Sequence, residues 1–480
     1  MKNVCWPYFD PDFDNLTERI FGPTCRVCID NESMEDCTVV MVDSVNKQGL
    51  LLEVVQVMTD LNLVISKSYI SSDAKWFMDV FHVQDEQGKK LRDQNVINCI
   101  QQAIGSTRES TTPRSPKARA YTNNVSRPDH LSEHTAIEMS GTDRPGLFSE
   151  ISAALADLHC NIVEAHAWSH NACLACVAYI SDQSSHAPIE DPRRLASIED
   201  HLTTLLRADM VPSISTGPSQ IKSQEVKTGG LLGGEGTGTN VERRLHQLML
   251  SVRDFDGPRM SSSSMNVNER SGTKMAVSIE NCDQKGYSIV SIECKDRPRL
   301  MFDTVCTLTD MQYVIFHASV VSHGGRAFQE YFIRHDDGYP LSTESEKERV
   351  IKCLEAAIER RVCEGVWLKL CAENRVGLLS DITRVLRENG LAVVRADIAT
   401  KGKEAVNAFY VRDVSGNEVD MGFIESMKKE MGLIDLEVKN DETTTTRANI
   451  SSHDQSHRFS FGDLLKSQLE RFSHNFIATK

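Results

Sequence analysis

Apolar positions along this chain follow two periods. Over residues 147–158 they recur every three or four positions, the spacing of one helix face: Leu147, Phe148, Ile151, Ala154, Leu155 and Leu158. The neighbouring segments TAIEMS, IVEAHAW and LACVAYISD alternate at every second residue, as strands do. A second helical pattern follows, with Leu195, Ile198, Leu202, Leu205 and Leu206 on one face. The stretch therefore predicts the order strand, helix, strand, strand, helix.

The region that ends near residue 440 repeats this order and adds a last strand. Its predicted strands are VWLKLC, AVVRADIAT, AVNAFYVRD and LIDLEV, and its first helix contains Leu378, Leu379, Ile382, Val385 and Leu386. The order βαββαβ predicts an α+β, ferredoxin-like unit, a four-stranded antiparallel sheet with two helices on one face. Because the other face carries no helix, another domain or chain is expected to cover it, most simply through side-by-side pairing of units.

A short turn motif precedes the first helix of each unit and occurs four times. It reads Asp or Asn, Lys or Arg, any residue, Gly and Leu, at residues 46–50, 143–147, 296–300 and 374–378. In the third copy Arg299 replaces the Gly. Each copy has an acid in the first helical turn, near the positive end of the helix dipole: Glu53, Glu150, Asp303 and Asp381. The chain is therefore predicted to contain four tandem copies of the unit.

Spacing and composition give the predicted boundaries. The units are 36–104, 135–216, 286–363 and 364–440; the linkers are 105–134 and 217–285; and 441–480 is a polar tail with an amphipathic helix. The first linker is rich in Ser, Thr, Pro and Arg, and the second is rich in Gly and holds a short helix that Thr239 and Glu242 could begin as a capping box. The third and fourth units have scarcely any linker between them, so they are expected to form a fixed pair. The tail helix carries Phe461, Leu465, Leu469, Phe472 and Phe476 on one face, and we expect it to pack on the chain's own domains more readily than on a partner or membrane surface.

Charge and targeting signals limit the class of protein. Lys and Arg total 53 against 68 Asp and Glu, a net charge of −15, which repels nucleic acid. The start of the chain, MKNVCWPYFDPDFD, resembles neither a secretory signal nor a transit peptide, and no apolar run is long enough to predict a membrane span. A soluble cytoplasmic or nuclear protein is expected; the basic residues of the first linker could be a weak nuclear signal, although a solvated linker is favoured.

The cysteines and histidines do not form a recognisable reactive site. The 14 cysteines are spread through predicted helices and strands, which favours reduced thiols. Cys173 and Cys176 lie three apart in an alternating strand, so they are expected to face opposite sides of the sheet, and the pair Cys25 and Cys28 has no matching pair nearby. The histidines follow no metal or catalytic spacing, and the Gly-rich segment lacks a Gly-Lys-Ser/Thr ending. We therefore predict no metal, no cofactor and no catalysis.

A βαββαβ unit that opens with Asp/Asn-Arg-Pro-Gly-Leu resembles the ACT domain, and four of them in one chain resemble the ACT domain repeat, or ACR, proteins of plants. The similar segments include GLLLEVVQVMTDLNLVISKSYISSDAKWFMDVFHV, DRPGLFSEISAAL, FQEYFIRHDDGYPL and NRVGLLSDITRVLRENGL, and the resemblance covers about residues 36–440 and the tail helix. It implies a non-enzymatic regulatory protein that binds free amino acids where units pair.

The resemblance and the turn chemistry together indicate the binding residues. Gly at the turn lets a ligand approach the backbone, and free N–H groups at the helix start attract a carboxylate. A side chain near the second strand is expected to reach across from a neighbouring unit. The candidates are Asp143, Gly146, Leu147 and Asn161 in the best-matching copy, and Asn46, Gly49, Asn62, Asn374, Gly377 and Asn389 elsewhere.

Two functional hypotheses follow. One is an amino-acid sensor read by a protein partner; the other is a ligand-free scaffold for protein–protein interaction. Arg299 is expected to fill or alter the third site, because its side chain stands where the other copies have Gly. Both a homodimer and a monomer remain compatible with the pattern.

Overall fold

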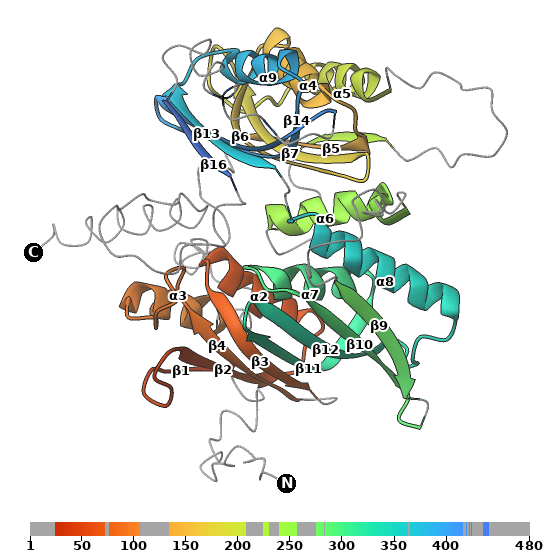
Figure 1. Cartoon of the computed structure of the whole chain (residues 1–480). Coiled ribbons are helices and arrows are strands. Elements are labelled where there is room, and N and C mark those ends of the chain that lie inside the picture. Colours follow the sequence, from red (N-terminus) through yellow and green to blue (C-terminus); the bar gives the residue numbers. More distant parts are fainter. Residues whose placement is uncertain are drawn as a thin grey trace, which may run out of the picture. The chain divides into compact units, whose positions relative to one another are not determined.

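The computed structural model forms two compact units (Figure 1). Unit 1 takes its described residues from 1–125 and 271–348, and unit 2 from 126–270 and 349–457. We number the four copies of the predicted unit as repeats 1–4 in chain order. The residues that the structure describes are 25–72, 76–105, 134–207, 224–229, 240–256, 275–282, 284–362, 365–415, 419, 422, 424 and 435–440. Most of the first linker, the Gly-rich segment and the predicted tail helix lie outside them.

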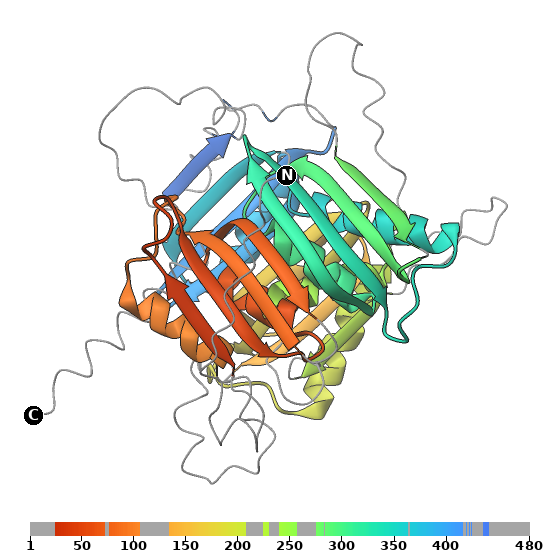
Figure 2. The ribbon, with the colours of Figure 1, turned by 90° about the horizontal axis from the view of Figure 1, so that it is seen from below.

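Unit 1 is built from repeats 1 and 3. Repeat 1 contains β1 (Arg26–Asp30), β2 (Thr38–Val45), α2 (Leu50–Asp60), β3 (Val64–Ser72), β4 (Trp76–Gln84) and α3 (Gln94–Gly105). Repeat 3 contains β9 (Ala276–Cys282), β10 (Tyr287–Lys295), α7 (Leu300–Asp310), β11 (Tyr313–His323), β12 (Arg326–His335) and α8 (Glu344–Glu359), whose last residues belong to unit 2. The strands form one sheet in the order β1-β2-β4-β3-β11-β12-β10-β9 (Figure 2).

Unit 2 is built from repeats 2 and 4. Repeat 2 contains β5 (Thr135–Thr142), α4 (Leu147–Asp157), β6 (Cys160–His170), β7 (Cys173–Asp182), α5 (Pro192–Arg207) and β8 (Glu225–Gly229). The connection to repeat 3 holds α6 (Val241–Ser251) and the 3₁₀ helix η3 (Asp254–Asp256). Repeat 4 contains β13 (Val366–Glu373), α9 (Leu378–Glu388), β14 (Leu391–Lys401), β15 (Glu404–Asp413) and β16 (Asp435–Asn440). The sheet order is β16-β13-β15-β14-β6-β7-β5-β8.

The predicted pairing of repeats 3 and 4 is wrong. The strands that join neighbouring repeats are β3 with β11 in unit 1 and β14 with β6 in unit 2, each pair antiparallel. These joining strands are the second core strand of each repeat. The short connection near residue 363 instead leaves repeat 3 after α8 and enters β13, which lies away from the joining edge. A short connection between two repeats therefore does not determine which repeats pair through their edge strands.

The order of elements also differs from the prediction in repeats 1 and 3. Their edge strands β1 and β9 come before the first core strand, outside the predicted boundaries at 36 and 286, whereas β8 and β16 follow the helices as expected. Strand β8 lies in what was predicted to be linker. Both arrangements place an antiparallel edge strand beside the first core strand, because β1 pairs with β2 and β8 pairs with β5. The ferredoxin-like sheet is therefore preserved in all four repeats.

Helices α4, α5 and α9 of unit 2 bury their apolar sides on one face of its sheet. Figure 1 shows α4, α5 and α9 on the same side of the strands. The core joins both repeats through buried residues such as Ile151, Ile382 and Phe409. Between α4 and α9, the hydroxyls of Ser152 and Thr383 are bonded at 2.8 Å. The two repeats thus share a single core.

The opposite face of this sheet is covered by helix α6. Helix α6 packs there through Leu245, Leu248, Met249 and Val252 against a second core that includes Trp168. The side chain of Asn240, and not the predicted Thr239, caps α6 by accepting from the N–H groups of Glu242 and Arg243. The expectation that Cys173 and Cys176 face opposite ways is confirmed, since they belong to the two different cores.

A buried ion network ties α6 and η3 to the rest of unit 2. Asp254 accepts two bonds from Arg360, at 2.6 and 2.7 Å, and a third from Nδ1 of His170 at 2.8 Å. Arg360 also contacts Nδ1 of His246 at 2.8 Å. The network links the β6–β7 hairpin, the connection between repeats and the residue after α8. Among the described helices, none is long and apolar enough to cross a membrane.

Candidate functional site

Each of the four turns places one residue in the left-handed region immediately before its helix. The φ angles are 82° at Gly49, 85° at Gly146, 77° at Gly377 and 67° at Arg299. Glycine adopts this conformation at no steric cost, whereas an L side chain is strained there. The sequence motif therefore corresponds to one backbone conformation that occurs in all four turns. Arg299 adopts this left-handed conformation although it has a side chain.

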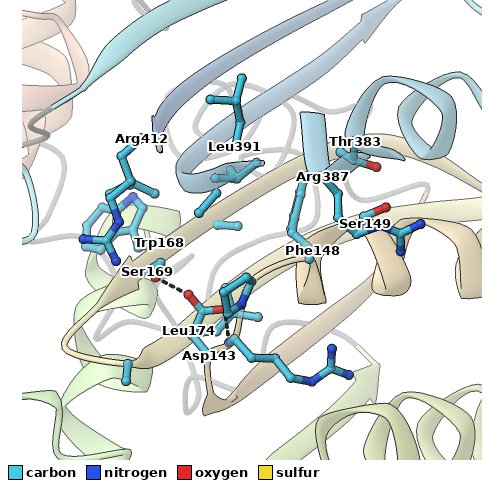
Figure 3. Close-up of a pocket in the computed structure, with 18 residues that line it drawn as sticks. Asp143, Phe148, Ser149, Trp168, Ser169, Leu174, Thr383, Arg387, Leu391 and Arg412 are labelled. Carbon is cyan, nitrogen blue, oxygen red and sulfur yellow. Dashed lines mark hydrogen bonds between the residues drawn. The ribbon is translucent and has the colours of Figure 1, made fainter. Parts of the chain in front are cut away.

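One pocket lies in unit 2, where the turn of repeat 2 faces the start of β14 in repeat 4. Its volume is about 180 Å³. Figure 3 shows Asp143, Trp168, Ser169 and Arg412 on one side of it, and Phe148, Ser149 and Arg387 on the other. Because the side chains come from both repeats, the pocket is complete only when repeats 2 and 4 are paired.

Asp143 is the acidic group of this pocket. Its carboxylate accepts from the hydroxyl of Ser169 and, at 2.9 Å, from the N–H of Arg144. Burial raises the pKa of Asp143 above its ordinary value, while the bond from Ser169 and the charges of Arg412 and Arg144 lower it in part. Since a buried carboxylate gains from a positive partner, the pocket favours a cationic group beside Asp143.

The arginines around the pocket have different roles. Arg144 donates to Glu150 at 2.8 Å and holds the pKa of that carboxylate below its usual range. The charge of Arg387 also acts on Glu150. Arg412 is an exposed residue next to the end of β15, and its charge acts on Asp143. Arg412 and Asp143 are therefore opposite charges that line the same pocket.

Gly146 lies under the side chain of Arg387 from the other repeat. A Cβ atom added at Gly146 would be 2.6 Å from Cδ of Arg387. The flexible arginine could move aside, but a larger side chain at Gly146 would then occupy pocket space. Gly146 is therefore required for room as well as for its φ angle of 85°.

A smaller pocket occupies the equivalent position in the other direction, where the turn of repeat 4 faces the start of β6 in repeat 2. Its volume is about 30 Å³, and its lining includes Asn374, Gly377 and Asn161. The amide of Asn161 donates to the hydroxyl of Ser181 at 3.4 Å. Two related turns in one unit thus leave very different amounts of space.

In unit 1, Arg299 takes part in the pairing itself. Its guanidinium donates to the side-chain carbonyl of Asn62, in repeat 1, at 2.9 Å. The side chain of Arg299 therefore reaches across the junction between repeats 3 and 1, and its predicted effect on a ligand site in repeat 3 stays a prediction. The turn of repeat 3 therefore contacts repeat 1 through the side chain of Arg299.

The predicted site residues other than Asn62 divide into four groups. Asp143 and Gly146 line the larger pocket, and Asn161, Asn374 and Gly377 line the smaller one. Leu147 begins α4 as a fully buried core residue, and Asn389 bonds its own helix through the carbonyl of Val385. Asn46 and Gly49 form the turn before α2 in repeat 1.

The three asparagines predicted to reach across are not equivalent. Asn62 occupies the left-handed position after α2, at φ 53°, as His159 does after α4 at φ 56°. In repeat 4, Asn389 comes one residue before the equivalent left-handed position, and in repeat 2, Asn161 comes two residues after it. The sequence pattern did not predict that Arg412 and Trp168 line the larger pocket. The alternating pattern of a strand shows which face of the sheet a side chain lies on, but it does not show which turn of another repeat lies next to that side chain.

Edge-to-edge pairs of ferredoxin-like repeats, with a pocket at the junction, define a protein built from ACT domains. Residues 33–111 match the ACR family N-terminal ACT domain, and residues 133–206 match the ACT domain. The chain is 62% identical to ACT domain-containing protein ACR2 of Arabidopsis thaliana, with all of both chains covered, and 49% identical to ACR3 of the same plant over 90% of each. The chain therefore belongs to the ACR family of ACT domain-containing proteins.

More distant similarities are local or weak. A segment of 86 residues is 34% identical to the bifunctional uridylyltransferase/uridylyl-removing enzyme of Azospirillum brasilense and covers 9% of that enzyme. Aspartate kinase from Synechocystis aligns with 83% of this chain and 55% of its own, at 12% identity and a TM-score of 0.14. Neither similarity bears on the chemistry of the pocket.

Proposed function

We propose that this protein is a non-enzymatic sensor that binds a free amino acid in the pocket between repeats 2 and 4. The observation that carries the proposal is that a carboxylate, Asp143, and a guanidinium, Arg412, line the same pocket of about 180 Å³. An amino acid carries an ammonium group and a carboxylate close together. Asp143 can accept from the ammonium, and Arg412 can pair with the carboxylate.

Binding at a junction gives the site a means of regulation. The ligand contacts both repeats, so it favours the paired arrangement over any other. A coupling of about 1–3 kcal/mol between ligand and arrangement would be typical of allosteric proteins. A protein partner that recognises the paired arrangement would then respond to the amino acid.

Thermal unfolding of the full chain with each of the twenty amino acids at millimolar concentration tests this proposal. A ligand at one hundred times its Kd stabilises the folded state by about 2.7 kcal/mol, which gives a measurable rise in Tm. Gly146→Arg should abolish the rise, and circular dichroism would show whether the variant is folded. If no amino acid raises Tm, the sensor proposal fails.

The scaffold alternative has its own supporting observation in unit 1. There, Arg299 and Asn62 connect repeats 3 and 1 directly, and the strand pairing of β3 with β11 needs no ligand. Binding to a partner protein that is independent of every amino acid, and unaffected by Gly146→Arg, would favour the scaffold.

A further inference from the structure

Most of the buried side chains that line the pocket between repeats 2 and 4 are apolar. The buried apolar lining residues are Ala167, Trp168, Leu174, Phe148 and Leu391, each at most 8% exposed, and the buried polar ones are Ser149 and Thr383. Arg387 and Arg412 are exposed side chains. A ligand therefore meets charge at the entrance and hydrocarbon further in.

The polar groups that remain inside are few and partly occupied. The hydroxyl of Thr383 donates to the carbonyl of Leu379 at 2.7 Å and meets the hydroxyl of Ser152. Asp143 has one bond at each carboxylate oxygen, from Ser169 and from the N–H of Arg144. Because an ionised carboxylate accepts at about four positions, Asp143 keeps capacity for an ammonium group.

We infer that the ligand of this pocket is an amino acid with an apolar side chain, bound with that side chain inward and its carboxylate at Arg412. The inference rests on the proposed function and adds the class of ligand. A polar side chain of the ligand that packs against Trp168, Leu174 and Leu391 would lose its hydrogen bonds to water, and these apolar side chains would not replace them. An apolar one gains from the same burial.

The size of the pocket is consistent with this class. Its volume of about 180 Å³ is large enough for a small ligand such as a single amino acid. Arg387, whose side chain crosses Gly146, limits the space on the side of repeat 4.

Isothermal titration of the full chain with pairs of amino acids of similar shape tests the inference. The pairs are valine with threonine, leucine with asparagine, and methionine with glutamine. An apolar pocket should favour the apolar member by about 10- to 100-fold, the range by which such pockets separate close analogues. Glutamate and aspartate test whether Arg387 recruits a second carboxylate.

Two variants assign the binding to this pocket. Gly146→Arg fills it, and Asp143→Asn removes the negative charge while keeping the shape of the side chain. Gly377→Arg is the matched control, because Gly377 has the same turn geometry at φ 77° but belongs to the smaller pocket. Binding that both pocket variants abolish and Gly377→Arg retains belongs to the larger pocket.

The outcomes separate the inference from the proposed function. Preference for valine, leucine or methionine, lost in Gly146→Arg and Asp143→Asn, supports both. Stronger binding of a polar or acidic amino acid, lost in the same variants, overturns the apolar class and leaves the sensor intact. Binding that persists in both pocket variants, or no binding of any amino acid, overturns both.

Discussion

His166 of repeat 2 and Asp397 of repeat 4 occupy equivalent positions and are bonded to each other, with 2.8 Å between Nδ1 and Oδ1. Their separation of 231 residues is the same as that of Gly146 and Gly377. Ser152 and Thr383, also 231 apart, meet in the same way between α4 and α9. Repeats 2 and 4 are therefore related by an approximate twofold axis that passes through both pairs.

Unit 1 has the same relationship with different chemistry. Its joining strands pair Tyr69 with Ser319, which are separated by the same interval as Gly49 and Arg299. The backbone ladder is thus common to both units, whereas the ion pair belongs to unit 2 alone at this position. Pairing of ACT domains does not require the charges, so their contribution can be removed and measured.

The first prediction concerns the pH dependence of unit 2. Burial opposes protonation of His166, but its bonds to Asp397 and to Glu164 outweigh this and raise the pKa to about 10. The ordinary pKa is about 6.5, so the stabilisation is fully present below pH 6.5 and is lost as pH rises through about 10. Chemical denaturation between pH 6 and 10 should show this loss, and His166→Gln should flatten it.

Two further variants make that measurement specific. Asp397→Asn removes the charged acceptor, so it should lower the free energy of unfolding by about 1.5–3 kcal/mol. His159→Gln is the control, since His159 is exposed and Gln312 already occupies the equivalent left-handed position in repeat 3. An unchanged pH profile in His166→Gln would show that the pair does not set the stability of unit 2.

The second prediction is that Arg299 and Asn62 are energetically coupled across repeats 1 and 3. Asn62→Gly keeps the left-handed backbone, at φ 53°, which asparagine tolerates better than most L residues, and removes the bond to Arg299. Arg299→Gly removes the same bond but also relieves the strain of φ 67°, which for an L residue is about 1–2 kcal/mol. Arg299→Gly should therefore be the less destabilising variant.

A double-mutant cycle measures the coupling directly. The free energies of unfolding of the two single variants and the double variant should give an interaction energy of about 0.5–3 kcal/mol. Strictly additive effects would mean that the bond does not join the repeats. Titration of Arg299→Gly with amino acids would also show whether removing the side chain opens a site in unit 1.

The third prediction concerns acid sensitivity around η3. Burial alone would raise the pKa of Asp254, but Arg360 and His170 lower it to about 2. A depressed pKa means that the stabilisation is present above the ordinary value of 3.8 and is lost as pH falls through about 2. Asp254→Asn should lower the free energy of unfolding at pH 7 by about 3–5 kcal/mol, because it leaves Arg360 buried without its ion pair.

Asp256→Asn provides the comparison. Asp256 lies in the same 3₁₀ helix but is exposed, and it pairs with the exposed Arg253. Its loss should change stability by less than about 1 kcal/mol. Equal effects of the two substitutions would contradict the role assigned to the buried network.

The sequence predicted local structure better than assembly. The spacing of Leu147, Ile151 and Leu155 was sufficient to predict α4, and the repeated turn motif was sufficient to predict the pocket residues Asp143 and Gly146. Both predictions succeeded because each pattern is contained in a short segment of the sequence. The pairing of repeats was predicted wrongly, since it depends on which edge strands fit together. Arg412 was missed for the same reason: it reaches the turn of repeat 2 only after distant strands have joined.

The last prediction is that the pocket communicates with α6 through Trp168. The indole lines the pocket, and its ring lies 4.9 Å from His246 of α6 and 5.0 Å from the guanidinium of Arg361. The same hairpin reaches η3 through Asn171, which donates to the backbone of Asp254 at 2.9 Å. A ligand that immobilises Trp168 should therefore also hold α6 in place.

Hydrogen exchange of residues 241–251 measures this effect. Saturating amino acid should slow exchange in α6, because local opening would break contacts that the ligand now supports. Trp168→Leu retains an apolar side chain but lacks the ring that spans pocket and helix, so ligand should no longer protect α6. Tyr339→Ala, at an exposed aromatic residue of unit 1, serves as the control. Protection of α6 that survives Trp168→Leu would mean that the signal passes through the ion network of Asp254 instead.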